Sequence, residues 1–133
     1  MLITELDLAI DVGRHLDAVG ARWCIGGSVA SSLLGVPRAT LDVDCAKDDE
    51  LSRAELARRI MLDVGGRTVT VCSPEDIILQ KLLWFVEAGG SERQWGDALG
   101  VVQTRRDELD LQYLEAHASS HGVAELLARL LAA

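Results

Sequence analysis

The sequence predicts a mixed α/β (α+β) chain in which a small core sheet is followed by a helical C-terminal half. Short apolar segments that end in glycine or polar turns predict strands and short helices in residues 1–72, whereas residues 73–133 repeat apolar side chains at helical spacing. A chain of 133 residues that is 49% hydrophobic can also bury its own core. We therefore expect one domain over residues 1–133, with an α/β core over 1–72 and a helical subdomain over 73–133.

The first predicted elements are a helix, a strand and a second helix. Residues 4–19 carry apolar side chains at helical spacing, and Thr4 and Asp7 have the spacing of a capping box. Residues 23–25 form an apolar run typical of a strand. The glycines after this run lead into a short helix over residues 29–34, which a glycine and a proline bring to an end.

Two further strand segments flank another predicted helix. Residues 40–45 alternate between apolar and polar side chains and predict a strand. Residues 52–60 predict a helix that begins at a serine and carries a glutamate at the capping-box offset. Residues 61–64 and 67–72 predict a β-hairpin around a two-glycine turn.

The C-terminal half contains four predicted helices. Residues 73–88 begin with a serine suited to the N-cap and a proline suited to the first helical position, and two glycines end the helix. Ser91 begins a second helix that runs to about residue 103, and Asp110 begins a third. Residues 122–131 predict the last helix.

The most informative motif is Gly26-Gly27-Ser28, followed fourteen residues after the serine by Asp42 and, two residues on, Asp44. Side chains alternate along a strand, so both aspartates are expected on one face, with Cα atoms about 6.6 Å apart. Two carboxylates at that spacing suit a divalent cation. A glycine turn at a helix start can bind phosphate through backbone N–H groups.

In this order and spacing, the two motifs resemble those of the DNA polymerase β-like nucleotidyltransferases. The resemblance implies that Asp42 and Asp44 are catalytic and bind Mg²⁺, and that the glycine turn holds a nucleoside triphosphate. On the same basis the nucleotide site of the N-terminal half comprises Gly26, Gly27, Ser28, Arg38 and Thr40. An ordinary βαβ unit with two solvent-facing aspartates is the alternative, because each motif alone is common.

The helical half extends the resemblance to the abortive-infection branch of these transferases, a group of minimal nucleotidyltransferases. In that branch a lysine on one helix, and a basic residue and an aspartate on the next, face the active site. The matching positions are Lys81, Arg93 and Asp97, which the resemblance assigns to nucleotide binding, with Lys81 also catalytic. A lysine in an apolar segment is costly to bury unless it meets an anion. Alternatively, its long stem reaches solvent along the helix flank.

The chain departs from this family in two respects. Active members place a third carboxylate on the strand next to the Asp-x-Asp strand, but the segment over residues 67–72 carries no acid. The chain also looks shortened after the Asp-x-Asp strand, because a short polar break leads almost directly into the next helix. A missing general base reduces proton abstraction, which typically contributes 10²- to 10⁴-fold in rate. Catalytic activity is therefore an open question at this point.

Composition excludes several other classes. The first nineteen residues carry acidic and basic side chains throughout, so no secretory leader is expected, and no apolar run has the length of a membrane span. The three cysteines have no zinc spacing and predict reduced core residues of a cytoplasmic protein. The net charge of −8 disfavours a large nucleic-acid surface, and no DNA-binding motif is present.

Two further patterns predict ordinary structure. His117 and His121 have helical spacing, but they lack the glutamate of a zinc motif and fit a helix C-terminus. Trp84, Phe85 and Trp95 fit a helix interface better than a base-stacking surface, because the chain has few other aromatic residues.

The leading hypothesis is thus a Mg²⁺-dependent nucleotidyltransferase that transfers a nucleoside monophosphate from the triphosphate to a hydroxyl of RNA or protein. The resemblance implies a toxin–antitoxin or phage-defence setting. The alternative is an inactive relative that binds a nucleotide or a protein and regulates it. A third carboxylate near Asp42 and Asp44 would discriminate the two.

Overall fold

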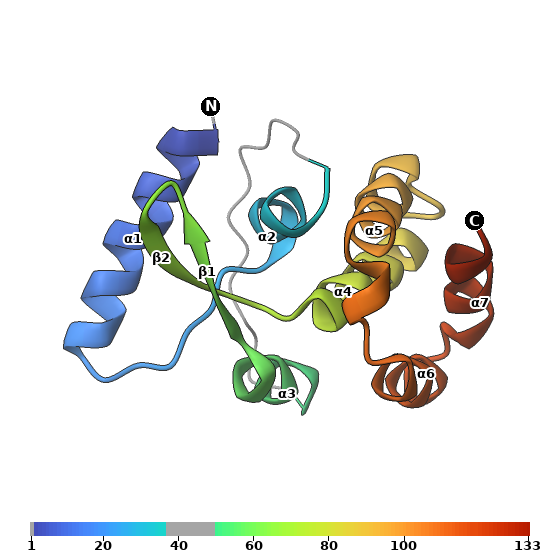
Figure 1. The fold of residues 1–133 in the computed structure, drawn as a ribbon. Helices are drawn as coiled ribbons and strands as arrows, with labels where there is room; N and C mark the ends of the chain where they lie inside the picture. Colours follow the sequence, from blue (N-terminus) through green and yellow to red (C-terminus); the bar gives the residue numbers. More distant parts are fainter. Residues whose placement is uncertain (1, 37–49) are drawn as a thin grey trace.

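The computed structural model describes residues 2–36 and 50–133 and is mostly helical, with a small antiparallel sheet (Figure 1). The elements are α1 (Leu2–Ala18), α2 (Gly27–Leu34), α3 (Glu50–Arg58), β1 (Ile60–Val64), β2 (Arg67–Val71), α4 (Pro74–Glu87), α5 (Glu92–Arg105), a 3₁₀ turn (Arg106–Glu108), α6 (Leu111–Ser120) and α7 (Ala124–Ala132). The expected mixed α/β class is confirmed at this coarse level. Over the described ranges, no helix is both long and apolar enough to cross a bilayer.

The predicted hairpin is confirmed as the β1–β2 pair. Ile60 pairs with Val71 and Val64 pairs with Arg67 in an antiparallel register. Gly65 and Gly66 have φ values of 58° and 81°, which are the left-handed values that a two-residue hairpin turn requires. The Asp63 carboxylate accepts a hydrogen bond of 2.9 Å from the Gly66 N–H and stabilises the turn.

The predicted strand over residues 23–25 is shorter than expected. Within residues 2–36 and 50–133, only Ile25 of this run pairs, in a single parallel bridge to Val71. The Ile25 N–H donates to the Thr70 carbonyl and the Cys72 N–H donates to the Ile25 carbonyl, both at 2.8 Å. The strand ends there because the chain turns at once through the two glycines into α2. The predicted strand over residues 40–45 lies outside the described residues.

Three predicted helix starts are confirmed and two are wrong. The side chains of Ser73, Ser91 and Asp110 each accept a hydrogen bond from the backbone N–H three residues on. By contrast, α1 begins at Leu2 and α3 at Glu50, so the two capping boxes predicted at Thr4 and Ser52 lie inside helices. No glycine or proline precedes either residue closely enough to stop the helix from extending upstream.

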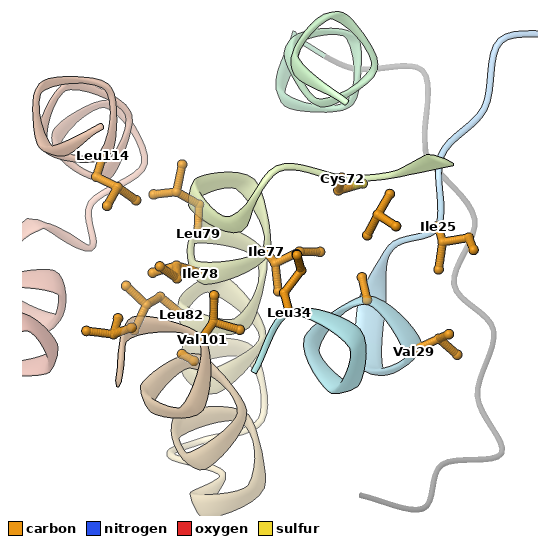
Figure 2. Close-up of a cluster of buried hydrophobic side chains, with 14 of the residues drawn as sticks. Ile25, Val29, Leu34, Cys72, Ile77, Ile78, Leu79, Leu82, Val101 and Leu114 are labelled. Atoms are coloured by element: carbon orange, nitrogen blue, oxygen red, sulfur yellow. The ribbon is translucent and has the colours of Figure 1, made fainter. Parts of the chain in front are cut away.

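The helix α4 lies at the centre of the hydrophobic core. It packs against α2, α5 and α6. Figure 2 shows Leu34 of α2 and Leu114 of α6 on opposite sides of α4, together with its own buried side chains. One cluster of buried hydrophobic residues runs from Leu6 in α1 to Leu130 in α7. The same core therefore contains residues from both halves of the sequence.

The end of α2 comes unusually close to α5. A Cβ atom built on Gly35 would lie 2.8 Å from the backbone carbon of Gly100 and 2.8 Å from the backbone nitrogen of Val101. The close approach of the two backbones therefore leaves no space for a side chain at Gly35, whose φ of −133° lies outside the left-handed region.

Replacing Gly35→Ala should force α2 and α5 apart and lower the free energy of unfolding by about 1–3 kcal/mol. The matched control is Gly96→Ala within α5, where no heavy atom of the described residues outside the adjacent helix backbone lies within 4 Å of the added Cβ. That control should be neutral or stabilising by up to about 1 kcal/mol, because alanine favours a helix over glycine. Urea unfolding of both variants measures the difference, and equal effects would contradict the close-approach argument.

Candidate functional site

The glycine turn begins helix α2 in the way that the sequence predicts. Gly26 is the N-cap, in an extended conformation and without a side chain to cap the helix, and Gly27 has a φ of 61°. Only glycine adopts that left-handed value without strain, so the backbone requires glycine at position 27. The Gly27 N–H donates to the side-chain oxygen of Gln80 on α4 at 3.4 Å. This bond ties the turn to the central helix.

Lys81 links three helices at one point. Its ammonium nitrogen donates to the Ser28 hydroxyl oxygen on α2 at 3.1 Å and lies 3.0 Å from an Asp97 carboxylate oxygen on α5. The same nitrogen lies 5.2 Å from the centre of the Trp84 ring. Ser28 and Lys81 are 53 residues apart in the sequence, and the fold brings them into direct contact.

Burial decides between the two interpretations of Lys81. Its side chain is 0% exposed and that of Asp97 is 6% exposed. An ammonium group that reached solvent along the helix flank would be accessible, so the flank alternative is excluded. Burying an unpaired ammonium would be prohibitively costly, but the Asp97 carboxylate and the Ser28 hydroxyl satisfy it here.

The other predicted site residues fall into two groups. Arg93 lies on α5 one turn before Asp97 and its side chain is exposed, so the buried cluster does not include it. Arg38, Thr40, Asp42 and Asp44 lie outside the described residues. The structure thus brings together Gly26, Gly27, Ser28, Lys81 and Asp97.

Gln80 is a residue of this site that sequence reasoning missed. It contacts the turn through the Gly27 N–H, and a Cβ on Gly26 would lie 3.7 Å from its side chain. Its signal in the sequence was its place beside Lys81 in an otherwise apolar helix segment. A polar pair in such a segment indicates that the helix meets another polar group there.

No metal site is evident in the described part of the chain. Among residues 2–36 and 50–133, no three histidine, cysteine, aspartate or glutamate side chains are grouped to hold an ion. His117 and His121 instead stack with ring centres 6.4 Å apart, and a His121 ring nitrogen lies 2.8 Å from the His117 carbonyl at the end of α6. The two aspartates that the sequence predicts as Mg²⁺ ligands are not among the described residues.

A second buried polar cluster surrounds the start of α4. The fully buried Asp76 carboxylate accepts hydrogen bonds from the Ser73 hydroxyl at 2.8 Å and from the Tyr113 hydroxyl on α6. The guanidinium of Arg58 stacks 3.7 Å above the Tyr113 ring and forms an ion pair of 3.1 Å with Glu75. These contacts join α3, α4 and α6.

The cluster shifts the pKa values of two of its members. Burial raises the pKa of Asp76, although the hydrogen bonds from Tyr113 and Ser73 and the charge of Arg58 act in the opposite direction. Burial, followed by the hydrogen bond to Asp76, raises the pKa of Tyr113 well above its usual value. Both shifts follow from the structural contacts of the helix start, and neither residue borders the glycine turn.

Comparison of the chain with protein-family models, with curated proteins and with solved structures finds no match. The interpretation of the site therefore depends on its own residues. They provide a glycine turn at a helix start, a hydroxyl, a buried ammonium and a carboxylate, contributed by three different helices.

Replacing Lys81→Met should lower the free energy of unfolding by about 3–5 kcal/mol, because the buried Asp97 carboxylate would lose the ammonium group that lies 3.0 Å from it. The double variant Lys81→Met/Asp97→Leu removes both charges and should recover most of that loss. Urea unfolding of the wild type, of the single variants Lys81→Met and Asp97→Leu, and of the double variant measures the coupling between the two residues. Additive single effects would show that the pair does not interact.

The Tyr113 hydroxyl should make stability depend on alkaline pH. Its pKa is raised in the folded state, so its contribution is fully present below about pH 10, the value for unfolded tyrosine, and is lost as the pH rises further. Tyr113→Phe should therefore be less stable than the wild type at pH 7 by about 1.5–3 kcal/mol, the range for a hydrogen bond to a charged group. The gap should shrink above pH 10. Urea unfolding of the wild type and Tyr113→Phe at pH 7 and above pH 10 tests this. A stability difference that is the same at both would contradict it.

Proposed function

We propose that this protein is a Mg²⁺-dependent nucleotidyltransferase-like domain that binds a nucleoside triphosphate at the Gly26–Ser28 turn. The observation that carries the proposal is the contact of Lys81 with both Ser28 and Asp97, at 3.1 and 3.0 Å. A turn serine, a helix lysine and an aspartate of the next helix are the combination that the resemblance to the abortive-infection branch implies. The apolar core alone does not require these three polar groups to meet.

The turn has the chemistry to bind phosphate. It lies at the N-terminus of α2, where backbone N–H groups and the helix dipole favour an anion. The Ser28 oxygen accepts a hydrogen bond from Lys81, which fixes the position of the hydroxyl. In this proposal Lys81 adds positive potential beneath the turn and positions Ser28, while Asp97 balances its charge.

The metal belongs to the same proposal. Asp42 and Asp44 would hold Mg²⁺, since carboxylate oxygens are suitable ligands and the two aspartates are only two residues apart in the sequence. Mg²⁺ would neutralise negative charge on the phosphates. Arg38, Thr40 and Arg93 would contribute further contacts to the nucleotide. A hydroxyl of RNA or of a protein side chain would attack the α-phosphorus, and pyrophosphate would leave.

A specific observation also favours the inactive relative as a second candidate. In the described structure, Asp97 is the acid that lies beside Lys81, and its carboxylate is already paired with the ammonium group of Lys81. Strand β2 carries no acid that could act as the third carboxylate. A domain of this kind would bind the nucleotide and regulate a partner, in a cytoplasmic toxin–antitoxin or phage-defence setting.

Calorimetry with ATP, CTP, GTP and UTP should show nucleotide binding that requires Mg²⁺, because the triphosphate supplies ligands that two aspartates lack. Asp44→Asn should abolish this binding. The matched control is Asp107→Asn, which removes the same charge from an exposed position of the 3₁₀ turn and should leave affinity unchanged. Unchanged affinity in Asp44→Asn would exclude Asp44 from the site.

Mass spectrometry then separates the two candidates. After incubation with Mg²⁺ and the preferred triphosphate, a transferase adds a nucleoside monophosphate to RNA or protein. A regulatory relative binds the same nucleotide and adds nothing to either.

A further inference from the structure

The cysteine pair Cys24 and Cys72 lies next to the glycine turn but is not one of the polar groups that contact Lys81. Their sulfur atoms lie 2.8 Å apart, and both residues are free thiols. The two cysteines flank the Ile25–Val71 bridge, one before Ile25 and the other after Val71. The two backbone hydrogen bonds of 2.8 Å at this bridge hold the two segments together.

We propose that Cys24 and Cys72 are a thiol oxidation site, which a small-molecule disulfide of the glutathione type converts to an intramolecular disulfide. A disulfide bond has a sulfur–sulfur distance of about 2.05 Å, so the sulfurs would have to approach by about 0.75 Å. A shift of this size is within the reach of side-chain rotation. The backbone pairing at Ile25 already supplies the alignment of the two segments.

The environments of the two thiols give them different roles. Cys24 is half-buried and accessible to a small reagent, whereas Cys72 is buried. The hydrogen bond between the thiols lowers the pKa of Cys24, and the same bond together with burial raises the pKa of Cys72. Cys24 is therefore the nucleophile that meets the oxidant, and Cys72 completes the reaction from inside.

The reaction balances as two thiol–disulfide exchanges. The Cys24 thiolate attacks one sulfur of the oxidant, the disulfide bond of the oxidant breaks, and one thiolate leaves and takes up a proton. The Cys72 thiol then loses its proton and attacks the Cys24 sulfur of the mixed disulfide, which releases the second small thiol. The two cysteines lose two electrons and two protons, and the oxidant gains both.

The disulfide would connect two segments that carry the glycine turn and the central helix. Cys24 lies two residues before Gly26, and Cys72 immediately precedes Ser73, the N-cap of α4. A Cβ on Gly26 would lie 3.5 Å from the Cys72 sulfur, so this sulfur borders the turn. In a reducing compartment the bond would persist only while the oxidant is in excess, which makes the site reversible.

The test uses the full chain with Cys45→Ser, which leaves only the pair. Folded protein is treated with oxidised glutathione, and its mass and its proteolytic peptides are measured. The protein should lose the mass of two hydrogen atoms, a single peptide should join Cys24 to Cys72, and reductant should reverse both changes. The melting temperature should rise by roughly 5–15 °C, because the bond closes a long loop.

Two variants in the same Cys45→Ser background assign the roles. Cys72→Ser should trap one glutathione on Cys24, and Cys24→Ser should leave Cys72 unmodified. If either variant fails to fold, the mass and the peptides of the oxidised Cys45→Ser protein still test the proposal by themselves. A stable mixed disulfide in the folded protein, two unmodified thiols, or a link that forms only in urea would overturn the proposal.

Discussion

The structure depends most on one buried ion pair, between Lys81 and Asp97, and on its hydrogen bond to Ser28. Removing an ammonium and a carboxylate from water costs on the order of several kcal/mol per ion, so the arrangement is stable only while the groups remain in contact. Because they belong to α4, α5 and α2, this requirement fixes three helices relative to one another. The close approach of Gly35 to the α5 backbone lets α2 come near enough for this.

The helix α4 must combine this polar contact with a central place in the core. Neighbouring helices cover several of its sides, so each polar group that it buries needs a partner. At its start, Asp76 is satisfied by Ser73 and Tyr113, with Arg58 nearby. At its middle, Lys81 is satisfied by Ser28 and Asp97. The apolar residues between these points fill the core, and the polar ones determine which surfaces of the neighbours face α4.

Features governed by local hydrogen bonds were predictable from sequence, and features governed by distant packing were not. The N-caps at Ser73, Ser91 and Asp110 and the two-glycine hairpin follow from a few adjacent residues, and all are confirmed. The Tyr113–Asp76 bond joins residues 37 apart, and no periodicity indicates it. The same holds for the Cys24–Cys72 contact across 48 residues. Spacing alone could not have related Ser28 to Lys81 either, because the two residues lie 53 positions apart in the sequence.

The glycine turn is held mainly from α4 and not by a sheet. In the described structure its segment joins β2 through the single bridge at Ile25, which is too little to fix a turn two residues further on. Three contacts with α4 and the residue before its N-cap also hold the turn in place. The Cys72 sulfur borders the turn, Gln80 accepts a hydrogen bond from the Gly27 N–H, and Lys81 donates one to the Ser28 hydroxyl. These contacts come from one continuous segment, residues 72–81, whose helix is capped at its start by Ser73. A displacement of α4 would therefore move the turn with it, so a change at the cysteine pair or at Asp97 would reach the backbone N–H groups of the turn through this helix.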